Sequence, residues 1–426
     1  MNILKKATQR IIKYDDKALL NIDENDHEND EELEGNEGLK TIGCARVSKC
    51  TSQEELRTYT LDERKYSNLK MGALLGKGSF GSVYRCSYKC ATWSGKCCVK
   101  IVKVDERYKN REVDIMTTLR DMPHTNIIGL IDTFTRKEDM AGDMNRSEDE
   151  DKEFSLAAKD YKVGLDDDME YGMVEDYEDM TGDDEVDRGE SRMYYIVMPR
   201  YRCNLKTLIY KKILHMHPIS RSKMLDRIGG DILRGLKHLH TYGIMHRDIK
   251  PENILYDTEG KRALLCDFGS AKNIEIGDKN NNSSYVCTRW YRAPELILGS
   301  CDYNNSVDIW AAGCVLIEMI TGKVLFREED NTSMLCKIFK ILGIPNARVF
   351  QELNKELDEG VVLKTIRMRN TRAIEETDGG GKMCLGMLSR ILHPHETHSN
   401  IYGMYIMGCM QYSPRLRVEY IDKYDG

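Results

Sequence analysis

Short apolar runs alternate with polar residues in the part of the chain that begins at Tyr66. They read SNLKMGALLGKGSF, GSVYRCSY and GKCCVKIVKV, and glycine or serine separates them. Runs rich in Val, Tyr, Leu and Cys with such punctuation predict strands joined by tight turns. We therefore expect an antiparallel meander here.

Helical spacing follows in the stretch DERYKNREVDIMTTL. Val113, Met116 and Leu119 recur three residues apart, which predicts a helix, and Asp105 is its expected N-cap. Two more apolar runs, NIIGLIDTF and MYYIVMP, predict further strands. Together these elements indicate a small β-rich lobe with one main helix, which we place at residues 63–201.

After Pro199 the apolar pattern becomes helical. The stretch SKMLDRIGGDILRGLKHLH predicts one helix, with an apolar stripe formed by Met224, Ile228, Ile232, Leu236 and Leu239. The stretch SVDIWAAGCVLIEMITG is apolar nearly all round, which is typical of a buried helix. The expected fold class is therefore α+β and bilobal, with a short hinge leading into a larger helical lobe at residues 202–426.

Charge is distributed unevenly along the chain. Residues 137–192 hold 22 acidic and 7 basic side chains, a net charge of about −15, although the whole chain carries only −7. This segment lies between two predicted strands, so we interpret it as an acidic insertion, either a solvated loop or a docking site for a basic partner. Residues 1–62 include the stretch NIDENDHENDEELEGNEG and predict a disordered acidic tail.

The composition, with 41% apolar residues, is that of a folded soluble protein. No apolar run approaches the roughly 18–20 residues of a membrane span, and MNILKKATQR is unlike a signal peptide, so no membrane partner is expected. The 14 cysteines lie mostly in apolar segments, which favours free thiols in a reducing compartment, cytoplasmic or nuclear. Basic stripes with interleaved aromatics are missing from the sequence, so no nucleic-acid partner is expected.

A glycine motif is the first of four with candidate chemistry. The stretch LGKGSFGSV places Gly76, Gly78, Gly81 and Val83 in the spacing GxGxxGxV between two predicted strands. Glycines there let backbone N–H groups close over phosphates, although a glycine-rich hairpin without a ligand has the same pattern. A dinucleotide-binding fold needs a helix after this motif, and here a strand is predicted instead.

The second feature is a lysine within an apolar strand. Lys100 ends the run CCVK, and Glu112 follows about a dozen residues later on the predicted helix. A lysine among apolar neighbours needs a buried anionic partner. Either Glu112 or a nucleotide phosphate meets that need.

The third and fourth motifs are HRDIKPEN, at residues 246–253, and CDFG, at residues 266–269. In the third, Asp248 is placed to accept a hydroxyl proton and Lys250 to neutralise a transferred phosphate. Asn253 and, in the fourth motif, Asp267 are expected to hold Mg²⁺ beside the phosphates.

With YRAPE at residues 291–295, these motifs complete the signature set of protein kinases in its usual order. From about residue 65 to Arg417 the chain resembles the eukaryotic protein kinases. The resemblance implies ATP and Mg²⁺ as cofactors, protein substrates, and an ion pair between Arg417 and Glu295. The segment HRDIKPEN corresponds to the catalytic loop of these kinases, and Lys250 within it is similar to the lysine of the serine/threonine class.

The same resemblance places the adenine of ATP at the hinge MPRYR. Met198 occupies the gatekeeper position. Pro199 offers its carbonyl to the ligand and Tyr201 its backbone N–H, so the missing N–H of the proline costs nothing.

The stretch TRWYRAPELILG resembles the group of cyclin-dependent, MAP and glycogen synthase kinase 3 enzymes. Within it, DFGSAK and YKNREVDIM are most similar to glycogen synthase kinase 3 of the shaggy family. In that group three basic residues converge on one phosphate, and their counterparts here are Arg111, Arg247 and Lys272. Three clustered cations favour a dianionic partner, whereas three separately solvated charges are the simpler alternative.

Two sources of this phosphate remain open. In glycogen synthase kinase 3 it belongs to a substrate already phosphorylated four residues C-terminal to the target. In cyclin-dependent kinases it sits on the enzyme's own loop, at the position of Ser283, whereas Tyr285 matches a tyrosine that shaggy and MAP kinases phosphorylate. We favour primed substrates. The alternatives are a cyclin-dependent-kinase-like enzyme that needs cyclin and phosphorylated Ser283, and a pseudokinase scaffold.

Overall fold

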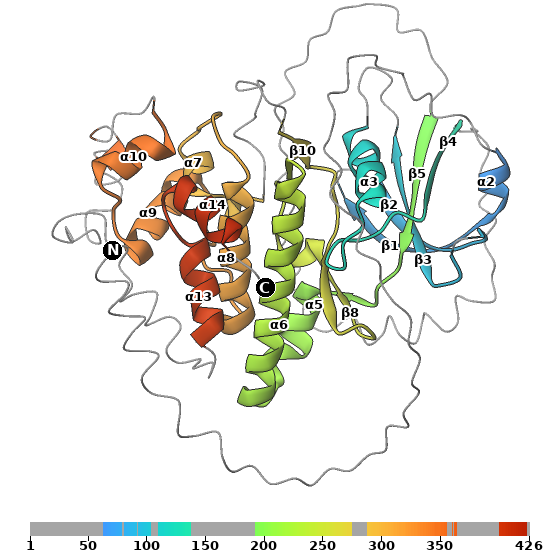
Figure 1. Cartoon of the computed structure of the whole chain (residues 1–426), viewed down its shortest axis with the longest axis horizontal. Coiled ribbons are helices and arrows are strands. Elements are labelled where there is room, and N and C mark those ends of the chain that lie inside the picture. The colour runs from blue at the N-terminus through green and yellow to red at the C-terminus, as the bar shows by residue number, and fades with distance from the viewer. Residues whose placement is uncertain are drawn as a thin grey trace, which may run out of the picture. The chain divides into compact units, whose positions relative to one another are not determined.

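The computed structural model describes residues 63–78, 81–91, 93–103, 110–137, 192–274, 288–355, 360, 362–363 and 400–423. Three predicted features lie outside these residues. They are the acidic tail, residues 138–191 of the acidic insertion, and the candidate phosphorylation sites Ser283 and Tyr285. The described part folds into a small β-rich lobe and a larger helical lobe (Figure 1). The predicted α+β architecture is confirmed.

Five antiparallel strands in the order β1-β2-β3-β5-β4 form the sheet of the small lobe. The helices and strands of the small lobe are α2 (Glu63–Ser67), β1 (Leu69–Gly78), β2 (Gly81–Tyr88), β3 (Cys97–Lys103), α3 (Arg111–Asp121), β4 (Asp132–Lys137) and β5 (Arg192–Pro199). Neighbouring β1, β2 and β3 form the predicted meander. Lys137 and Arg192 are register partners, so the acidic segment joins the adjacent ends of β4 and β5.

Apolar side chains cover both faces of this sheet. On β3, Cys97 and Val99 belong to one buried cluster and Cys98 to the other, because successive strand residues point to opposite faces. The helix α3 packs within the cluster that contains Cys98. Lys100, two residues after Cys98, therefore points to the face that α3 covers.

The helix α3 begins later than the sequence pattern suggests. Its N-cap is Asn110, whose side-chain oxygen accepts from the backbone N–H groups of Glu112 and Val113. The predicted cap, Asp105, is therefore wrong; Asn and Asp cap helices about equally well, so residue preference does not distinguish them. The observed start makes Arg111 the first helical residue and puts Glu112 in the first turn.

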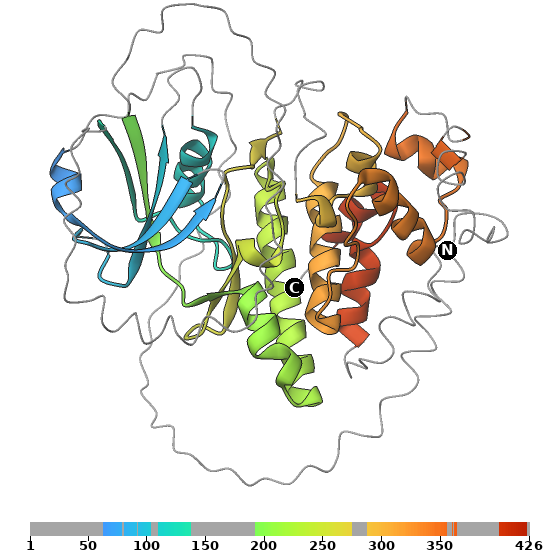
Figure 2. The ribbon, with the colours of Figure 1, turned by 180° about the vertical axis from the view of Figure 1, so that it is seen from behind.

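Helices dominate the large lobe (Figures 1 and 2). They are α5 (Leu205–Lys211), α6 (Pro218–Thr241), α7 (Pro294–Ile297), α8 (Ser306–Thr321), α9 (Asn331–Leu342), α10 (Ala347–Leu353), α13 (Asn400–Cys409) and α14 (Pro414–Asp422). In the described part of this lobe, 3-10 turns accompany them at η2 (Ile213–His215), η3 (Pro251–Asn253) and η4 (Arg289–Tyr291). Short strands are β6 (Cys203–Asn204), β7 (Ile244–Met245), β8 (Ile254–Asp257), β9 (Arg262–Leu265) and β10 (Lys272–Asn273).

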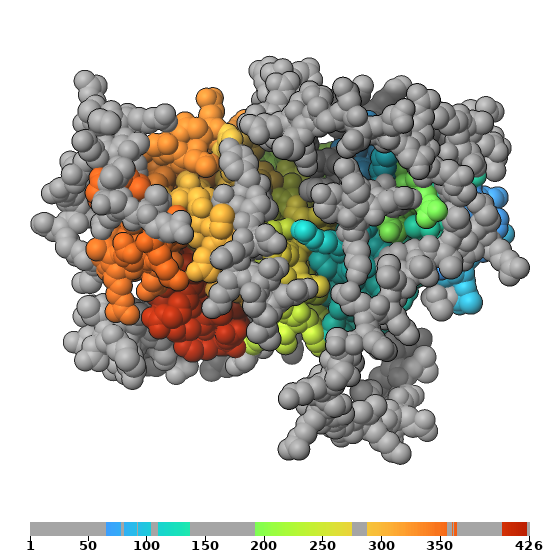
Figure 3. All heavy atoms as spheres, turned by 90° about the horizontal axis from the view of Figure 1, so that it is seen from above, coloured from blue at the N-terminus to red at the C-terminus, as the bar shows by residue number. Residues whose placement is uncertain are grey.

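Two helices form the centre of this lobe. α8 is buried from residue 306 to residue 320, as its apolar pattern predicts, and it packs against α6 and α13. On α6 the predicted stripe is confirmed except at its start, where Leu225 is fully buried and Met224 only half-buried. In Figure 3 the atoms of the large lobe run from green through yellow and orange to red. None of the described helices combines the length and apolarity needed to cross a membrane.

The two lobes are joined at the segment before β4. The backbone of Leu265 on β9 exchanges hydrogen bonds of 2.9 Å with the Asn126 carbonyl and the Ile128 N–H. The Asn126 amide donates to the Ala263 carbonyl at 2.9 Å. Gly235 of α6 lies against this junction, where a Cβ atom would sit 2.9 Å from the Asn126 carbonyl oxygen. Glycine at this position thus permits the close approach of helix and strand.

A buried ion pair connects α7 with α14. Arg417 Nη2 lies 2.7 Å from both carboxylate oxygens of Glu295, and its Nη1 donates to the Ser306 carbonyl at 3.0 Å. The guanidinium also lies 5.5 Å from the ring centroid of Trp310. The pairing of Arg417 with Glu295 that the resemblance implied is confirmed.

Candidate active site

A buried lysine connects two carboxylates that come from different lobes. Lys100 on β3 places its Nζ atom 2.7 Å from both Oε1 and Oε2 of Glu112 on α3. The same ammonium group lies 2.8 Å from Oδ1 of Asp267, which follows β9 in the large lobe. Lys100 thus has the anionic partners that its apolar neighbours require.

These contacts set the charges of the site. Burial lowers the pKa of Lys100, but the Glu112 and Asp267 carboxylates outweigh this effect and raise it overall. Burial raises the pKa of Asp267, and the Lys100 ammonium more than reverses that, so the pKa stays below its ordinary value. At neutral pH the site therefore presents a cationic Lys100 and an anionic Asp267.

The loop that carries Asp248 is fixed by Asp308, a buried carboxylate on α8. Asp308 accepts the backbone N–H of His246 at 2.8 Å and that of Arg247 at 2.7 Å. Arg247 has a φ angle of 63°, a conformation that costs a non-glycine residue about 1–3 kcal/mol. The bonds to Asp308 hold the chain in this turn and direct the next side chain, that of Asp248, into the site.

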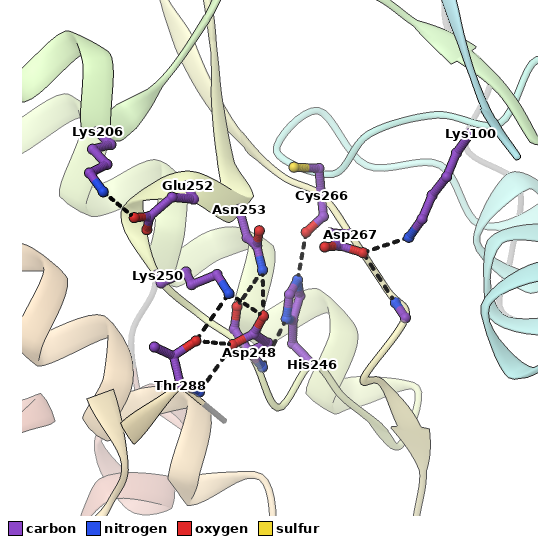
Figure 4. A network of polar contacts seen from close by, with 11 residues as sticks. Lys100, Lys206, His246, Asp248, Lys250, Glu252, Asn253, Cys266, Asp267 and Thr288 are labelled. Carbon is purple, nitrogen blue, oxygen red and sulfur yellow. Dashed lines mark hydrogen bonds and ion pairs between the residues drawn. The ribbon is translucent and has the colours of Figure 1, made fainter. Parts of the chain in front are cut away.

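Three side chains converge on the carboxylate of Asp248 (Figure 4). Thr288 donates to Oδ1 of Asp248 through its hydroxyl at 2.9 Å and through its backbone N–H at 3.2 Å. Lys250 Nζ lies 2.8 Å from Oδ2, and it donates to the Thr288 hydroxyl at 3.0 Å. Asn253 donates to Oδ2 at 2.9 Å. The carboxylate is thereby held in one orientation with a cation at its side.

Asp267 occupies a second strained backbone position. Its φ angle is 65°, and its carboxylate accepts from Lys100 and from the backbone N–H of Gly269. The next residue, Phe268, is fully buried and packs 5.2 Å from the ring of His246. Figure 4 shows Asp267 between Lys100 and the group around Asp248.

Asn253 and Asp267 fit a Mg²⁺ ion. The Asn253 amide nitrogen is used by Asp248, so its oxygen is directed away from that carboxylate, as Figure 4 shows. Amide and carboxylate oxygens are the ligands that Mg²⁺ prefers, usually one or two from protein with phosphates and waters completing the shell. Within the described residues no group of three or more His, Cys, Asp or Glu side chains is arranged to hold a metal.

The glycine motif forms the β1–β2 hairpin. Gly78 pairs with Gly81, and Gly76 pairs with Val83. Gly81 has a φ angle of 139°, and a Cβ atom there would lie 2.3 Å from the Ile101 carbonyl oxygen, so only glycine fits. Around Gly76, by contrast, such an atom would meet no neighbour within 4 Å.

The predicted hinge residues lie at the end of β5 and just beyond it. Met198 is buried and pairs with Cys98, while Pro199 pairs with Cys97. Tyr201 follows at the entry to the large lobe and is half-buried.

Two of the three predicted phosphate-binding residues are linked through one short ladder. Lys272 on β10 pairs with Met245 on β7, two residues before Arg247. The Arg247 side chain donates to the Ser270 carbonyl at 2.7 Å and to the Tyr303 hydroxyl at 3.4 Å. The helix α3, which begins at Arg111, contacts β10.

The sequence analysis missed the role of Thr288. Its hydroxyl contacts both Asp248 and Lys250, although it stands 40 residues after Asp248 in the chain. The available signal was a hydroxyl residue three positions before YRAPE. The anchoring role of Asp308 was also missed, because its stretch was interpreted only as a buried helix.

Comparison with family models matches the protein kinase domain to residues 179–414, more than half of the chain. The chain belongs to the protein kinase family. The matched stretch of this kinase holds HRDIKPEN, CDFG and YRAPE, whereas Lys100 and Glu112 precede it. The contact between Lys100 and Asp267 joins the matched stretch to the residues that precede it.

Proposed function

We propose that this kinase is a serine/threonine kinase that transfers the γ-phosphoryl group of Mg-ATP to protein hydroxyls. The arrangement of Asp248 carries the proposal. Its carboxylate is oriented by Thr288 and Asn253, and Lys250 lies 2.8 Å away. A carboxylate fixed in this way is suited to accept a hydroxyl proton, while the lysine neutralises the phosphate in transit.

The other residues have distinct roles in this proposal. Lys100, oriented by Glu112, binds the ATP phosphates. Asp267 and Asn253 hold Mg²⁺, which neutralises charge on the phosphates as they react. The hairpin of Gly76, Gly78, Gly81 and Val83 covers the phosphates with backbone N–H groups.

Adenine is proposed to bind between the hairpin and the end of β5. Met198 limits the depth of the site, Pro199 offers its carbonyl, and Tyr201 offers its backbone N–H. Cys97 and Cys98, the register partners of Pro199 and Met198, hold this edge of the sheet in place.

For substrate choice we propose a preference for primed protein substrates, as in glycogen synthase kinase 3. Arg247 is buried and fixed beside β10, which carries Lys272, and α3, whose first residue is Arg111, contacts the same strand. Guanidinium and ammonium groups on three converging elements suit a phosphate dianion. The expected substrate carries a phosphoserine four residues C-terminal to its target.

Two alternatives give different results in one experiment. A cyclin-dependent-kinase-like enzyme places phosphorylated Ser283 on the same cations and depends on cyclin. A pseudokinase scaffold transfers no phosphate, although the presence of Lys100, Asp248, Asn253 and Asp267 argues against it.

The experiment measures phosphate transfer from Mg-ATP to two peptides, one with phosphoserine four residues after the target serine and one without it. Asp248→Ala is the blank. Preference for the primed peptide that is lost in Lys272→Ala supports the proposal. Equal rates on both peptides, or activity only after cyclin is added or Ser283 is phosphorylated, contradict the primed-substrate assignment. No transfer above the blank under any of these conditions contradicts the kinase activity itself.

A further inference from the structure

Two cysteines face each other across the hairpin that leads to Lys100. Cys86 on β2 and Cys97 on β3 are direct register partners, and their Sγ atoms lie 3.4 Å apart. Directly opposite residues of antiparallel strands have Cα atoms about 4.5–5.5 Å apart, which falls inside the range of disulfides, about 4.4–6.8 Å. The backbone is therefore already placed for a bond, and only the side chains need to move.

The surroundings of the two sulfur atoms differ. The Cys86 thiol donates to Cys97 Sγ, and the Cys97 thiol donates to the Cys86 carbonyl at 3.1 Å. The pKa of Cys97 is lowered to about 7, chiefly because the Cys86 thiol donates a hydrogen bond to it. Burial acts in the opposite direction, whereas the Tyr88 backbone N–H and Arg200 lower the pKa further. The bond to Cys97, and after it burial, raise the pKa of Cys86. Cys97 is thus the sulfur suited to act as a thiolate, and Cys86 remains a thiol beside it.

We propose that Cys86 and Cys97 form a site of reversible oxidation, at which a hydroperoxide converts the two thiols into a disulfide. The Cys97 thiolate attacks one peroxide oxygen, the O–O bond breaks, and the released hydroxide takes a proton to become water. Cys86 then loses its proton and attacks the sulfur of the Cys97 sulfenic acid. The S–O bond breaks, the S–S bond forms and a second water leaves. Two thiols are oxidised by two electrons, and one hydrogen peroxide is reduced to two waters.

Neighbouring cysteines do not share this geometry. Cys98 is next in the chain but pairs with Arg85 and belongs to the cluster on the opposite face of the sheet. Cys90 lies beyond the end of β2 and pairs with Trp93. Cys97 itself is buried, so a small hydroperoxide has to enter where the hairpin opens at the exposed residues 94–96. In a reducing compartment the bond would be transient.

The test uses the full chain, treated with hydrogen peroxide, alkylated and digested with trypsin without reduction. Cleavage after Arg85, Lys89, Lys96 and Lys100 releases the peptides CSYK and CCVK. We expect a linked pair, lighter than the separate peptides by two hydrogen atoms, that dithiothreitol separates. Fragment ions between the two cysteines of CCVK assign the link to Cys97 in the unmodified sequence, so the result does not depend on a variant that folds.

Variants then test each step. The linked peptide should persist in Cys98→Ser and disappear in Cys97→Ser. In Cys86→Ser a sulfenic acid should accumulate at Cys97 and react with dimedone. The proposal is overturned if the wild-type chain gives no linked pair at a peroxide concentration that already oxidises the exposed Cys301. A link that maps to Cys98, or dimedone labelling that spares Cys97, overturns the assignment of the attacking thiol.

Discussion

The hydroxyl of Thr288 donates to Oδ1 of Asp248 at 2.9 Å, and the backbone N–H of the same threonine donates to that oxygen at 3.2 Å. Lys250 contacts both residues, so the threonine links the carboxylate to the cation beside it. Oδ2 of Asp248 is contacted by Lys250 at 2.8 Å and by Asn253 at 2.9 Å, so donors on both sides fix the plane of the carboxylate.

Replacing Thr288 with valine should lower kcat, and the loss of a hydrogen bond to a charged group should also reduce protein stability. The variant keeps the shape and the backbone bond but loses the hydroxyl. A hydrogen bond to a charged group contributes about 1.5–3 kcal/mol, and each 1.36 kcal/mol of barrier changes the rate by about tenfold, so kcat should fall roughly ten- to a hundredfold. Steady-state phosphate transfer measures it.

The matched control is Thr288→Ser, which retains the hydroxyl and should keep kcat within about threefold of wild type, since the bond to Asp248 is preserved. Equal activity of the valine and serine variants would show that the hydroxyl does not orient Asp248 during catalysis.

Local motifs were sufficient to find the residues whose spacing is fixed within a few positions, such as Asp248 with Lys250 and Asn253. The same is true of elements with a regular apolar period, such as α6. Contacts between distant segments were harder. Thr288 reaches Asp248 only because the large lobe folds a segment 40 residues away back onto the loop.

Strand register and helix caps also could not be predicted from the sequence. Cys86 and Cys97 meet because β2 and β3 pair in one register, and a shift of one residue would move their side chains to opposite faces of the sheet. The helix α3 starts at Arg111 because Asn110, and not Asp105, is its N-cap. Asn and Asp are about equally common as caps, so the sequence alone does not decide between them.

Replacing Lys100 with methionine should reduce both activity and stability. Activity should fall roughly a hundredfold or more, because a fixed positive charge at the phosphates is lost. Stability should fall by about 3–5 kcal/mol, because the buried Glu112 loses its counter-charge. Lys103→Met, at the exposed end of the same strand, should change neither.

The double variant Lys100→Met/Glu112→Gln separates the two effects. A neutral amide removes the unpaired charge of Glu112, so the midpoint of urea denaturation should recover in part, because Asp267 still lacks Lys100, while phosphate transfer stays low. Recovery of activity together with stability would contradict a direct role of Lys100 at the phosphates.

Alanine substitution should distinguish two glycines of the same hairpin. Gly81→Ala places a Cβ atom 2.3 Å from the Ile101 carbonyl oxygen at a φ of 139°, so the β2–β3 pairing must shift and the melting temperature should fall. The strained backbone alone costs about 1–3 kcal/mol. Gly76→Ala meets open space and should melt close to wild type. Comparable losses in both variants, measured by calorimetry, would be evidence against this reading of the hairpin.

Two arginines of α14 should differ strongly in their effect on stability. Arg417→Leu leaves the carboxylate of Glu295 buried without its partner, so the free energy of unfolding should fall by about 3–5 kcal/mol. Arg415 is exposed and pairs with Glu419 on the surface, so Arg415→Leu should cost less than about 1 kcal/mol. Urea denaturation of both variants tests this difference, and a small loss in Arg417→Leu would contradict the structural importance of the buried pair.

The ion pair of Asp267 with Lys100 should make stability depend on pH in the acidic range. The pKa of Asp267 is lowered in the folded chain from its ordinary value of 3.8, because the Lys100 ammonium outweighs the effect of burial. The unfolded chain therefore takes up this proton at a higher pH than the folded chain does. The contribution to stability is fully present above the unfolded pKa and is lost as pH falls through the folded one.

Asp267→Asn, which is nearly isosteric, isolates this contribution. Urea denaturation of wild type and variant between about pH 2 and pH 7 should give a stability difference that is constant at neutral pH and shrinks on acidification. Asp302→Asn is the control, because Asp302 is exposed and pairs with the exposed Lys355. A difference between wild type and Asp267→Asn that stays constant down to the lowest pH would mean that Lys100 does not hold Asp267 in its charged form.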